Sequence, residues 1–244
     1  MTQIQMAIPQ QLPLGIGLND DARFDNFYLS EHSANRFALC AVRELLNPEG
    51  ERFVTLWGGP GRSHLAQALC VESADLGWQV QYLPLRAVRD YAFEPDAVHS
   101  LLAGLEHMDL VCLDDVDAIA GMSAWELGLF HLFNRLRDAG VPLLITSEEN
   151  PAHLNIGLAD LQSRLQWGLS CQLHALTDAE KTEALQRRAE ARGLQLPDEV
   201  ASFIIQRVPR DMNLLFSVLD RLDRASLQEK RKLTIPFVKQ VLGH

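Results

Sequence analysis

A glycine-rich segment, LWGGPGRSHL at residues 56–65, has the residue types of a phosphate-binding loop. Gly58, Gly59 and Gly61 let backbone amides approach phosphate oxygens closely, and the helix that follows directs the positive end of its dipole at the same charge. Ser63 is the candidate ligand for Mg²⁺. The segment therefore predicts a nucleotide site, and the alternative is an ordinary glycine turn before a helix.

The loop departs from the common pattern GxxxxGK[ST] in two ways. Leu56 stands where the pattern requires its first glycine, so the loop is about two residues short. Arg62 replaces the lysine, and its planar fork differs from a compact ammonium although the charge is kept. We therefore expect the site to bind phosphate but not to hydrolyse a nucleotide efficiently by itself.

A second chemical feature, DLVCLDDV at residues 109–116, is an apolar run that ends in two acids. Such a run suits a buried parallel strand. Asp114 then stands where a strand-end carboxylate holds Mg²⁺, and Asp115 where a second acid orients the metal or a water molecule. Acids at strand ends are also common in turns, so the pair gains its meaning from the glycine loop upstream.

The elements that must position these residues form an alternating strand and helix pattern over residues 23–175. This alternation is typical of βαβ units and predicts an α/β fold with a parallel sheet of five strands. The strand candidates are the apolar runs Phe53–Trp57, Val80–Leu85, Leu110–Leu113, Leu143–Thr146 and Ser170–Leu173.

Residues 176–244 carry only helical signals and predict a small all-helical domain. Thr177 and Glu180 form a capping box at the start of its first helix. Pro197 and Thr234 mark the starts of two later helices.

Composition narrows the class of protein. The chain has 244 residues and a net charge of -10, which argues against a protein that grips nucleic acid by itself. Its four cysteines have no CxxC spacing and predict buried thiols in a reducing compartment. No apolar run reaches the ~20 residues of a membrane span, and residues 1–22, which lack basic residues, predict a flexible tail. We expect a soluble, cytoplasmic protein.

Together these features resemble the AAA+ ATPases of the replication-initiator group, the DnaA-related family, over nearly the whole chain. Within this family the chain is similar to the regulators that inactivate DnaA. The specific motifs are the GRS loop variant, SRLQWG at residues 163–168 and TIPFVK at residues 234–239; RFDNF at 23–27, LVCLDD at 110–115 and LLITS at 143–147 agree with them.

The resemblance implies an AAA+ P-loop domain with a parallel five-stranded sheet over residues 23–175, followed by a small helical lid domain over residues 176–244. The chain stops at His244, without the helix-turn-helix domain by which DnaA reads its origin. We therefore expect a regulator of initiation and not an initiator.

The resemblance also implies roles for residues outside the loop. Phe24 and Phe27 would line the adenine side of the nucleotide pocket, with a hydrophobic staple as the alternative. Thr146 and Ser147 would form the polar sensor of the γ-phosphate or the attacking water, although such a pair is also common in turns. The whole cofactor-binding set is then Phe24, Phe27, Gly58, Gly59, Pro60, Gly61, Arg62, Ser63, His64, Asp114, Arg210 and Asn213.

The lid departs from the family pattern at one position. Asn213 stands where the lid helix normally supplies an arginine to the phosphates, and Arg210 lies one helical turn earlier as a candidate substitute. With the short loop, this points to a site that holds a nucleotide as a ligand more than it turns it over. The resemblance suggests ADP, with Mg²⁺ at Ser63 and Asp114, as the occupant.

Arg164 matches the arginine finger of the family, a residue that reaches into the nucleotide site of a neighbouring subunit. The alternative is a surface helix arginine paired with Asp160 at i, i+4. The surrounding SRLQWG motif favours the finger.

The tail contains a short motif of its own, QLPLGI at residues 11–16. Gln11, Leu12, Leu14 and Ile16 are similar to the peptide by which many replication proteins dock on the DNA polymerase III sliding clamp. An extended segment can place alternate apolar side chains in a groove. The alternative is a linker with some leucines.

The resulting hypothesis is negative control of replication initiation. The nucleotide-bound protein, docked on the DNA-loaded clamp, meets ATP-loaded DnaA and inserts Arg164 to promote hydrolysis in the partner's site. DNA is then reached through the clamp, no membrane is involved, and self-association stays open. Two alternatives remain: a stand-alone P-loop ATPase or kinase, and an adaptor similar to helicase loaders.

Overall fold

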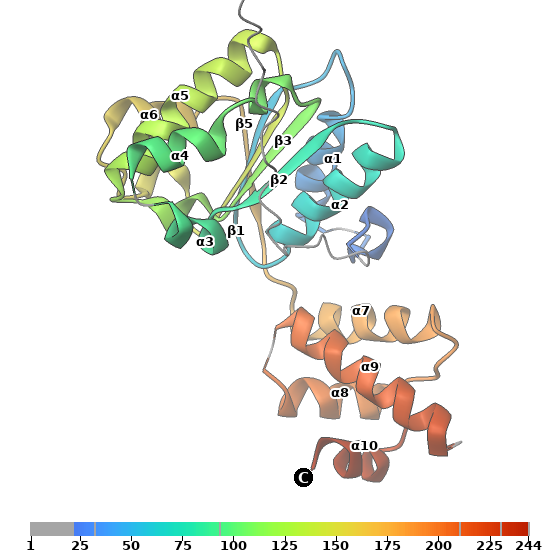
Figure 1. Ribbon diagram of the computed structural model, residues 1–244. Coiled ribbons are helices and arrows are strands. Elements are labelled where there is room, and N and C mark those ends of the chain that lie inside the picture. Colours follow the sequence, from blue (N-terminus) through green and yellow to red (C-terminus); the bar gives the residue numbers. More distant parts are fainter. Residues whose placement is uncertain (1–21, 32, 93, 210, 230, 244) are drawn as a thin grey trace, which may run out of the picture.

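A parallel five-stranded sheet forms the centre of the molecule (Figure 1). The computed structural model describes residues 22–31, 33–92, 94–209, 211–229 and 231–243. The strand order is β2-β3-β4-β1-β5, and every pairing is parallel. The predicted five-stranded α/β sheet is therefore confirmed, with strands β1 (Phe53–Gly58), β2 (Val80–Pro84), β3 (Leu110–Asp114), β4 (Leu143–Ser147) and β5 (Leu169–Leu173).

The inner strands are apolar because helices cover both of their faces. β3 and β4 are buried at every residue. Alternate residues of β3 enter different cores: Leu110 and Cys112 join the cluster on one face, and Val111 and Leu113 join the cluster on the other. Because all strands are parallel, their carboxyl ends meet at one edge of the sheet, the carboxyl edge, and their first residues at the opposite, amino edge.

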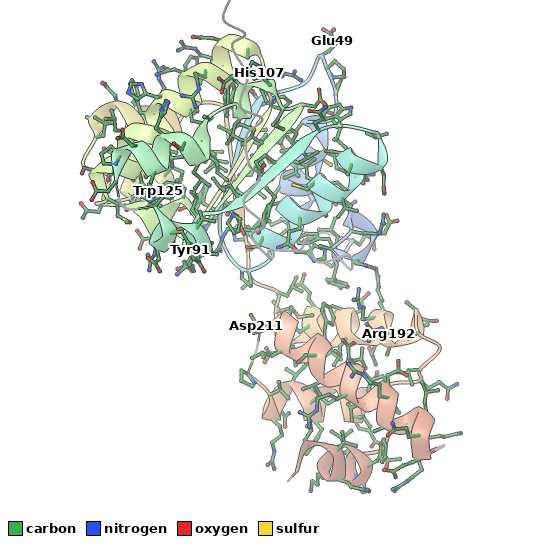
Figure 2. All side chains as sticks on the ribbon, viewed as in Figure 1. Glu49, Tyr91, His107, Trp125, Arg192 and Asp211 are labelled. Atoms are coloured by element: carbon green, nitrogen blue, oxygen red, sulfur yellow. The ribbon has the colours of Figure 1, made fainter. Side chains whose placement is uncertain are left out.

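Helices α1 (Arg36–Glu44) and α2 (Arg62–Asp75) cover one face, and α4 (Pro95–Leu102), α5 (Ser123–Ala139) and α6 (Ala159–Leu165) cover the other (Figure 1). On the second face Trp125 is 0% exposed, and its indole N–H donates to the carbonyl of Ala92 at 2.8 Å (Figure 2). A short helix, α3 (Leu85–Val88), follows β2. Single turns of 3-10 helix lie at Phe24–Asn26, Arg89–Tyr91, Leu105–His107, Val116–Ile119 and Pro151–His153.

The chain after the sheet forms a separate helical layer, as predicted (Figure 1). It consists of α7 (Asp178–Glu190), α8 (Asp198–Arg207), α9 (Met212–Glu229) and α10 (Ile235–Leu242), which enclose their own apolar cluster. Thr177 caps α7 in the predicted capping box with Glu180, and the side chain of Thr234 caps α10. In this layer Arg192, labelled in Figure 2, forms an ion pair with Asp220.

The segment before α1 contacts the first helix of this layer. The Tyr28 hydroxyl donates to Glu183 at 2.7 Å, and the Ser30 hydroxyl donates to Glu180 at 2.9 Å. The guanidinium of Arg187 lies 5.2 Å from the centroid of the Tyr28 ring. Side-chain contacts thus join the amino-terminal segment of the α/β part to α7.

The cysteines correct one prediction. Cys70, Cys112 and Cys171 are buried as expected, but Cys40 is exposed, and all four are free thiols. Cys40 lies on α1, whose buried residues are Ala38, Ala41 and Val42. The helix directs these to the core and leaves Cys40 on its solvent side.

Candidate functional site

The glycine loop lies at the carboxyl edge of the sheet, between β1 and α2. Gly58 and Gly61 have φ values of 98° and 106°, which explains why glycine stands at both positions. A Cβ on Gly59 would lie 2.7 Å from the backbone nitrogen of Ala175. The Gly59 N–H donates to the carbonyl of Leu173 at 2.7 Å, so the loop is bound closely to the end of β5.

The side chain of Arg62 turns back into this loop. Its Nη1 donates to the carbonyls of Gly58 and Gly59, at 2.8 Å to the latter, and its Nη2 lies 4.0 Å from Asp115 Oδ1 and from Glu148 Oε1. The buried Nε has no hydrogen-bond partner among the described residues. Arg62 therefore supports the loop from within, where the sequence suggested a direct contact with phosphate.

The start of α2 is the part of the loop best suited to an anion. Gly61 provides no side-chain cap, so the N–H groups of the first turn, from Arg62 to His64, have no capping side chain. Ser63 lies in the same turn and is half-buried. Uncapped amides at the positive end of a helix dipole are a ready phosphate site.

Aromatic residues before α1 take two different places. Phe24 is 5% exposed within the core beneath α1 and α2, and the guanidinium of Arg43 lies over its ring. Phe27 lies against the loop: a Cβ on Gly61 would be 3.0 Å from its Cε2, and its ring centroid is 5.9 Å from that of His64. The structure therefore brings Phe27, and not Phe24, to the glycine loop.

His64 connects the start of α2 to the amino-terminal segment. Its Nε2 lies 3.0 Å from the carbonyl oxygen of Arg23. Burial lowers the pKa of His64, and the hydrogen bond to Arg23 only partly offsets this effect. The neutral ring thus serves as a packing partner of Phe27 and brings no positive charge to the loop.

Asp114 and Thr146 form one buried network at the ends of β3 and β4. Asp114, which is 3% exposed, accepts hydrogen bonds from the Thr146 hydroxyl at Oδ1 and from the Tyr82 hydroxyl at Oδ2, the latter at 2.6 Å. The Thr146 oxygen in turn accepts the backbone N–H of Asp115 at 2.8 Å. Burial, and then the charge of Asp114, raise the pKa of Tyr82. Each carboxylate oxygen has a further lone pair, so Asp114 keeps the capacity to face a cation.

Ser147, by contrast, stays outside this network. It is 0% exposed, and its hydroxyl oxygen has no hydrogen-bond partner among the described residues. Of the two residues predicted as a polar sensor, the structure joins only Thr146 to the acids.

Asp115 belongs to an ion-pair cluster with residues that the sequence did not single out. Its carboxylate accepts from Arg86 Nε at 3.0 Å, and Arg86 Nη2 lies 3.2 Å from Asp117 and 3.0 Å from Glu148. Among the described residues Asp115 is the only non-glycine with positive φ, at 58°. Burial raises the pKa of Asp115, whereas the hydrogen bond from Arg86 lowers it and opposes this effect.

A positional signal was available for these missed residues. Glu148 directly follows β4, and Arg86 lies two residues after β2, so both stand at the carboxyl ends of strands adjacent to β3. Ligands of open α/β sheets bind at this edge. Tyr82 could have been found by its place one strand away from Asp114, but only with the strand order known.

Arg164 lies at the amino edge of the sheet, opposite the glycine loop. It is near the end of α6, and its guanidinium carbon is 5.0 Å from the centroid of the Trp167 ring. That ring is stacked beside Phe53, the first residue of β1, with centroids 6.5 Å apart. No ion pair joins Arg164 to Asp160 or to another carboxylate within the described ranges.

Several predicted residues lie outside the described part of the chain, namely Gln11, Leu12, Leu14 and Ile16 of the clamp motif and Arg210 of the lid. Asn213 falls within α9, but its side chain is outside the description.

Within the described part, no group of three or more His, Cys, Asp or Glu side chains is arranged to hold a metal ion by itself, and no helix has the length and apolarity to cross a membrane.

Comparisons with known proteins agree with this architecture. Domain III of the Thermotoga maritima replication initiation protein DnaA is 24% identical, with a TM-score of 0.76 over 93% of this chain and 98% of that one. AMPPCP-bound DnaA from Aquifex aeolicus is 20% identical, with a TM-score of 0.67 over 83% of this chain and 65% of that one. The Thermotoga maritima RuvB branch migration motor is 17% identical, with a TM-score of 0.65 over 91% and 71%.

Two family models divide the chain between them. The model of the bacterial DnaA ATPase domain matches residues 18–172, which is more than half of the chain, and the model of the Hda lid domain matches residues 178–242. The chain therefore belongs to the DnaA-related AAA+ family and combines a DnaA-type ATPase domain with an Hda-type lid.

Proposed function

We propose that this chain is a nucleotide-bound regulator of replication initiation that promotes hydrolysis of the ATP held by DnaA. The observation that carries this proposal is the position of Arg164, at the amino edge of the sheet and stacked on Trp167. The glycine loop of the same chain lies at the opposite, carboxyl edge of the sheet. The DnaA-type ATPase domain and the Hda-type lid support the assignment to replication control.

The length of β1 supports a role for Arg164 at a site outside its own chain. Trp167 lies beside Phe53, and the glycine loop begins at Gly58, the other end of the same strand. At the rise of an extended strand, this separation is about 16 Å. An arginine side chain is too short to span it, so the guanidinium acts on a phosphate bound by a partner.

The chain's own site binds ADP or ATP as a ligand in this proposal. The uncapped start of α2, the two left-handed glycines and Phe27 support a nucleotide there, and a DnaA of the same fold is described as bound to AMPPCP. Ser63 and Asp114 would hold Mg²⁺, which neutralises phosphate charge when bound. ADP is the expected occupant.

The same site is poorly arranged for turnover. Asp115 is held by Arg86, and Arg62 is engaged by carbonyls of its own loop. A stand-alone ATPase or kinase needs these groups at the water molecule or at the transferring phosphoryl group. The geometry thus favours the regulator over the enzyme, with Asp115, Thr146 and Ser147 supporting at most slow hydrolysis.

Docking of residues 11–16 on the sliding clamp completes the proposal. The net charge of -10 opposes direct binding of DNA, so the clamp would bring the protein to DNA and to DnaA. Because these partners act on the bacterial chromosome, we expect the protein in the cytoplasm. An adaptor for a replicative helicase would instead bind the helicase and would not bind the clamp.

The decisive experiment follows hydrolysis of DnaA-bound ATP with and without this protein, and with and without DNA-loaded clamp. We expect strong stimulation only when protein and loaded clamp are both present. Equal hydrolysis in all four mixtures would refute the proposal. Stimulation that does not depend on the clamp would refute the docking step alone.

A further inference from the structure

One exposed aromatic ring holds two arginines at the amino edge of the sheet. Trp167 is 47% exposed, and the guanidinium carbons of Arg164 and Arg137 lie 5.0 and 5.7 Å from its ring centroid. The same ring lies at a small interplanar angle to Phe53 and Phe133, 17° and 28°, with centroids 6.5 and 6.0 Å apart. The indole is thus anchored to the core while part of it faces solvent.

The backbone holds this ring close to Arg164. The backbone N–H of Trp167 donates to the carbonyl of Arg164 at 3.0 Å, and this hydrogen bond closes a tight turn between α6 and β5. Gly168 follows with φ of 84°, and a Cβ there would lie 2.2 Å from the carbonyl oxygen of Phe53. Only glycine lets the turn press so closely against β1, so the turn fixes the backbone from which the indole projects.

The two arginines differ in their charge partners. Arg137 forms hydrogen bonds of 2.9 and 2.7 Å to the carboxylate of Asp138. Arg164 forms no ion pair with any carboxylate that the structure describes. The indole therefore restrains the Arg164 guanidinium without neutralising it and without bringing a negative charge that would repel a phosphate.

We propose that Trp167 is a positioning residue for the arginine finger. A free arginine side chain samples many rotamers, and stacking on a fixed ring restricts them before the partner arrives. The gain belongs to the transition state, where Arg164 must meet developing phosphoryl charge, more than to the affinity of the two proteins. This inference rests on the proposed role of Arg164 in the partner's site.

The test measures the maximal rate of DnaA-bound ATP hydrolysis and the concentration of this protein that gives half of that rate, with loaded clamp present. Trp167→Leu should lower the maximal rate about two- to five-fold, the equivalent of about 0.5–1 kcal/mol for an exposed cation–π contact. The half-maximal concentration should stay unchanged. Trp167→Phe should retain more than half of the rate, because a smaller ring still offers a face to the cation.

A matched control and a shape-preserving variant separate positioning from packing. Tyr91→Leu removes another exposed aromatic ring, 76% exposed, and should leave both parameters unchanged. If Trp167→Leu fails to fold, a tetrafluorinated tryptophan introduced only at position 167 keeps the shape of the indole while weakening its negative face. It should lower the maximal rate by a similar factor and leave thermal unfolding unchanged.

The single variant Arg164→Ala distinguishes failure of this inference from failure of the proposed function. If Arg164→Ala still stimulates hydrolysis, the finger itself is wrong. If Arg164→Ala abolishes stimulation but Trp167→Leu and the fluorinated variant keep the full maximal rate, only the positioning role is overturned. An effect of Trp167→Leu on the half-maximal concentration alone would make Trp167 a partner contact and would also overturn it.

Discussion

The hydroxyl of Tyr82 donates a hydrogen bond of 2.6 Å to Oδ2 of Asp114 and so joins β2 to the acid at the end of β3. Asp114 is 3% exposed, and its other oxygen accepts the hydroxyl of Thr146. A buried carboxylate needs such donors, because water cannot reach it. Tyr82 is therefore part of the support of the candidate nucleotide site.

Tyr82→Phe should lower the free energy of unfolding by about 1.5–3 kcal/mol at neutral pH, the range for a hydrogen bond to a charged group. Because the pKa of Tyr82 is raised in the folded protein, its contribution is fully present below about pH 10, the unfolded pKa, and is lost as the pH rises toward the folded-state pKa. Urea unfolding of wild type and variant across this range measures the effect.

One control and one contrary result test this role. The control Tyr91→Phe alters a hydroxyl on a residue that is 76% exposed and should match wild type at every pH. If the difference between Tyr82→Phe and wild type stayed constant above about pH 10, the hydroxyl would not be the titrating source of the stability.

ADP with Mg²⁺ should raise the melting temperature of the chain in proportion to the logarithm of its concentration, because a ligand of the folded state stabilises by mass action. Ser63→Ala should reduce the Mg²⁺-dependent part of this shift. Ser100→Ala, which removes a hydroxyl bound to the carbonyl of Asp96 on α4, should not. Differential scanning fluorimetry with and without Mg²⁺ measures both variants.

ATP turnover by the chain alone should be far below about 1 per second, a rate ordinary for an ATPase. The physical reason is that Arg86 holds Asp115, and Arg62 is bound to its own loop. Single-turnover measurement of radiolabelled ATP checks this. A rate near that of ordinary ATPases would instead favour a stand-alone ATPase or kinase.

Arg164→Ala should abolish stimulation of DnaA, since fingers of this kind contribute roughly 10³ to 10⁵ in rate. Arg164→Lys should fail nearly as fully, because a point charge cannot replace a bidentate fork. Both variants should fold, bind ADP and bind the clamp as wild type does.

Arg207→Ala is the control for the finger. Arg207 is an exposed arginine whose guanidinium carbon also lies over an aromatic ring, 5.4 Å from the centroid of Phe203 on α8, whereas Arg164 is half-buried. Its removal should leave stimulation intact. Arg164→Ala activity within a few-fold of wild type at saturating concentration would return Arg164 to an ordinary surface residue.

Replacing Gln11, Leu12 and Leu14 together by alanine should abolish binding to the sliding clamp, because a short docking peptide depends on a few anchors. Thermal stability and the ADP shift should not change. A control replaces Gln3, Ile4 and Met6, which repeat the same residue spacing nearer the start of the chain. Surface plasmon resonance on immobilised clamp should show loss for the first triple variant only.

The sequence by itself determined the parts of this protein that depend on local patterns. Apolar runs predicted the five strands, because burial on both faces requires them to be apolar. The capping box at Thr177 and the cap at Thr234 predicted the starts of α7 and α10, because a cap satisfies backbone groups within the next turn. The glycines at 58 and 61 likewise indicated a loop whose backbone amides can approach a phosphate, and the structure gives both of them positive φ.

Only the tertiary structure decided how side chains from distant segments meet. Tyr82 reaches Asp114, Arg86 reaches Asp115 and Trp167 stacks beside Phe53 because the strand order and the turns bring these segments together. The inward turn of Arg62 and the isolation of Ser147 depend on the same packing. Local sequence encodes backbone preference, whereas these contacts follow from the arrangement of whole elements, which no local pattern specifies.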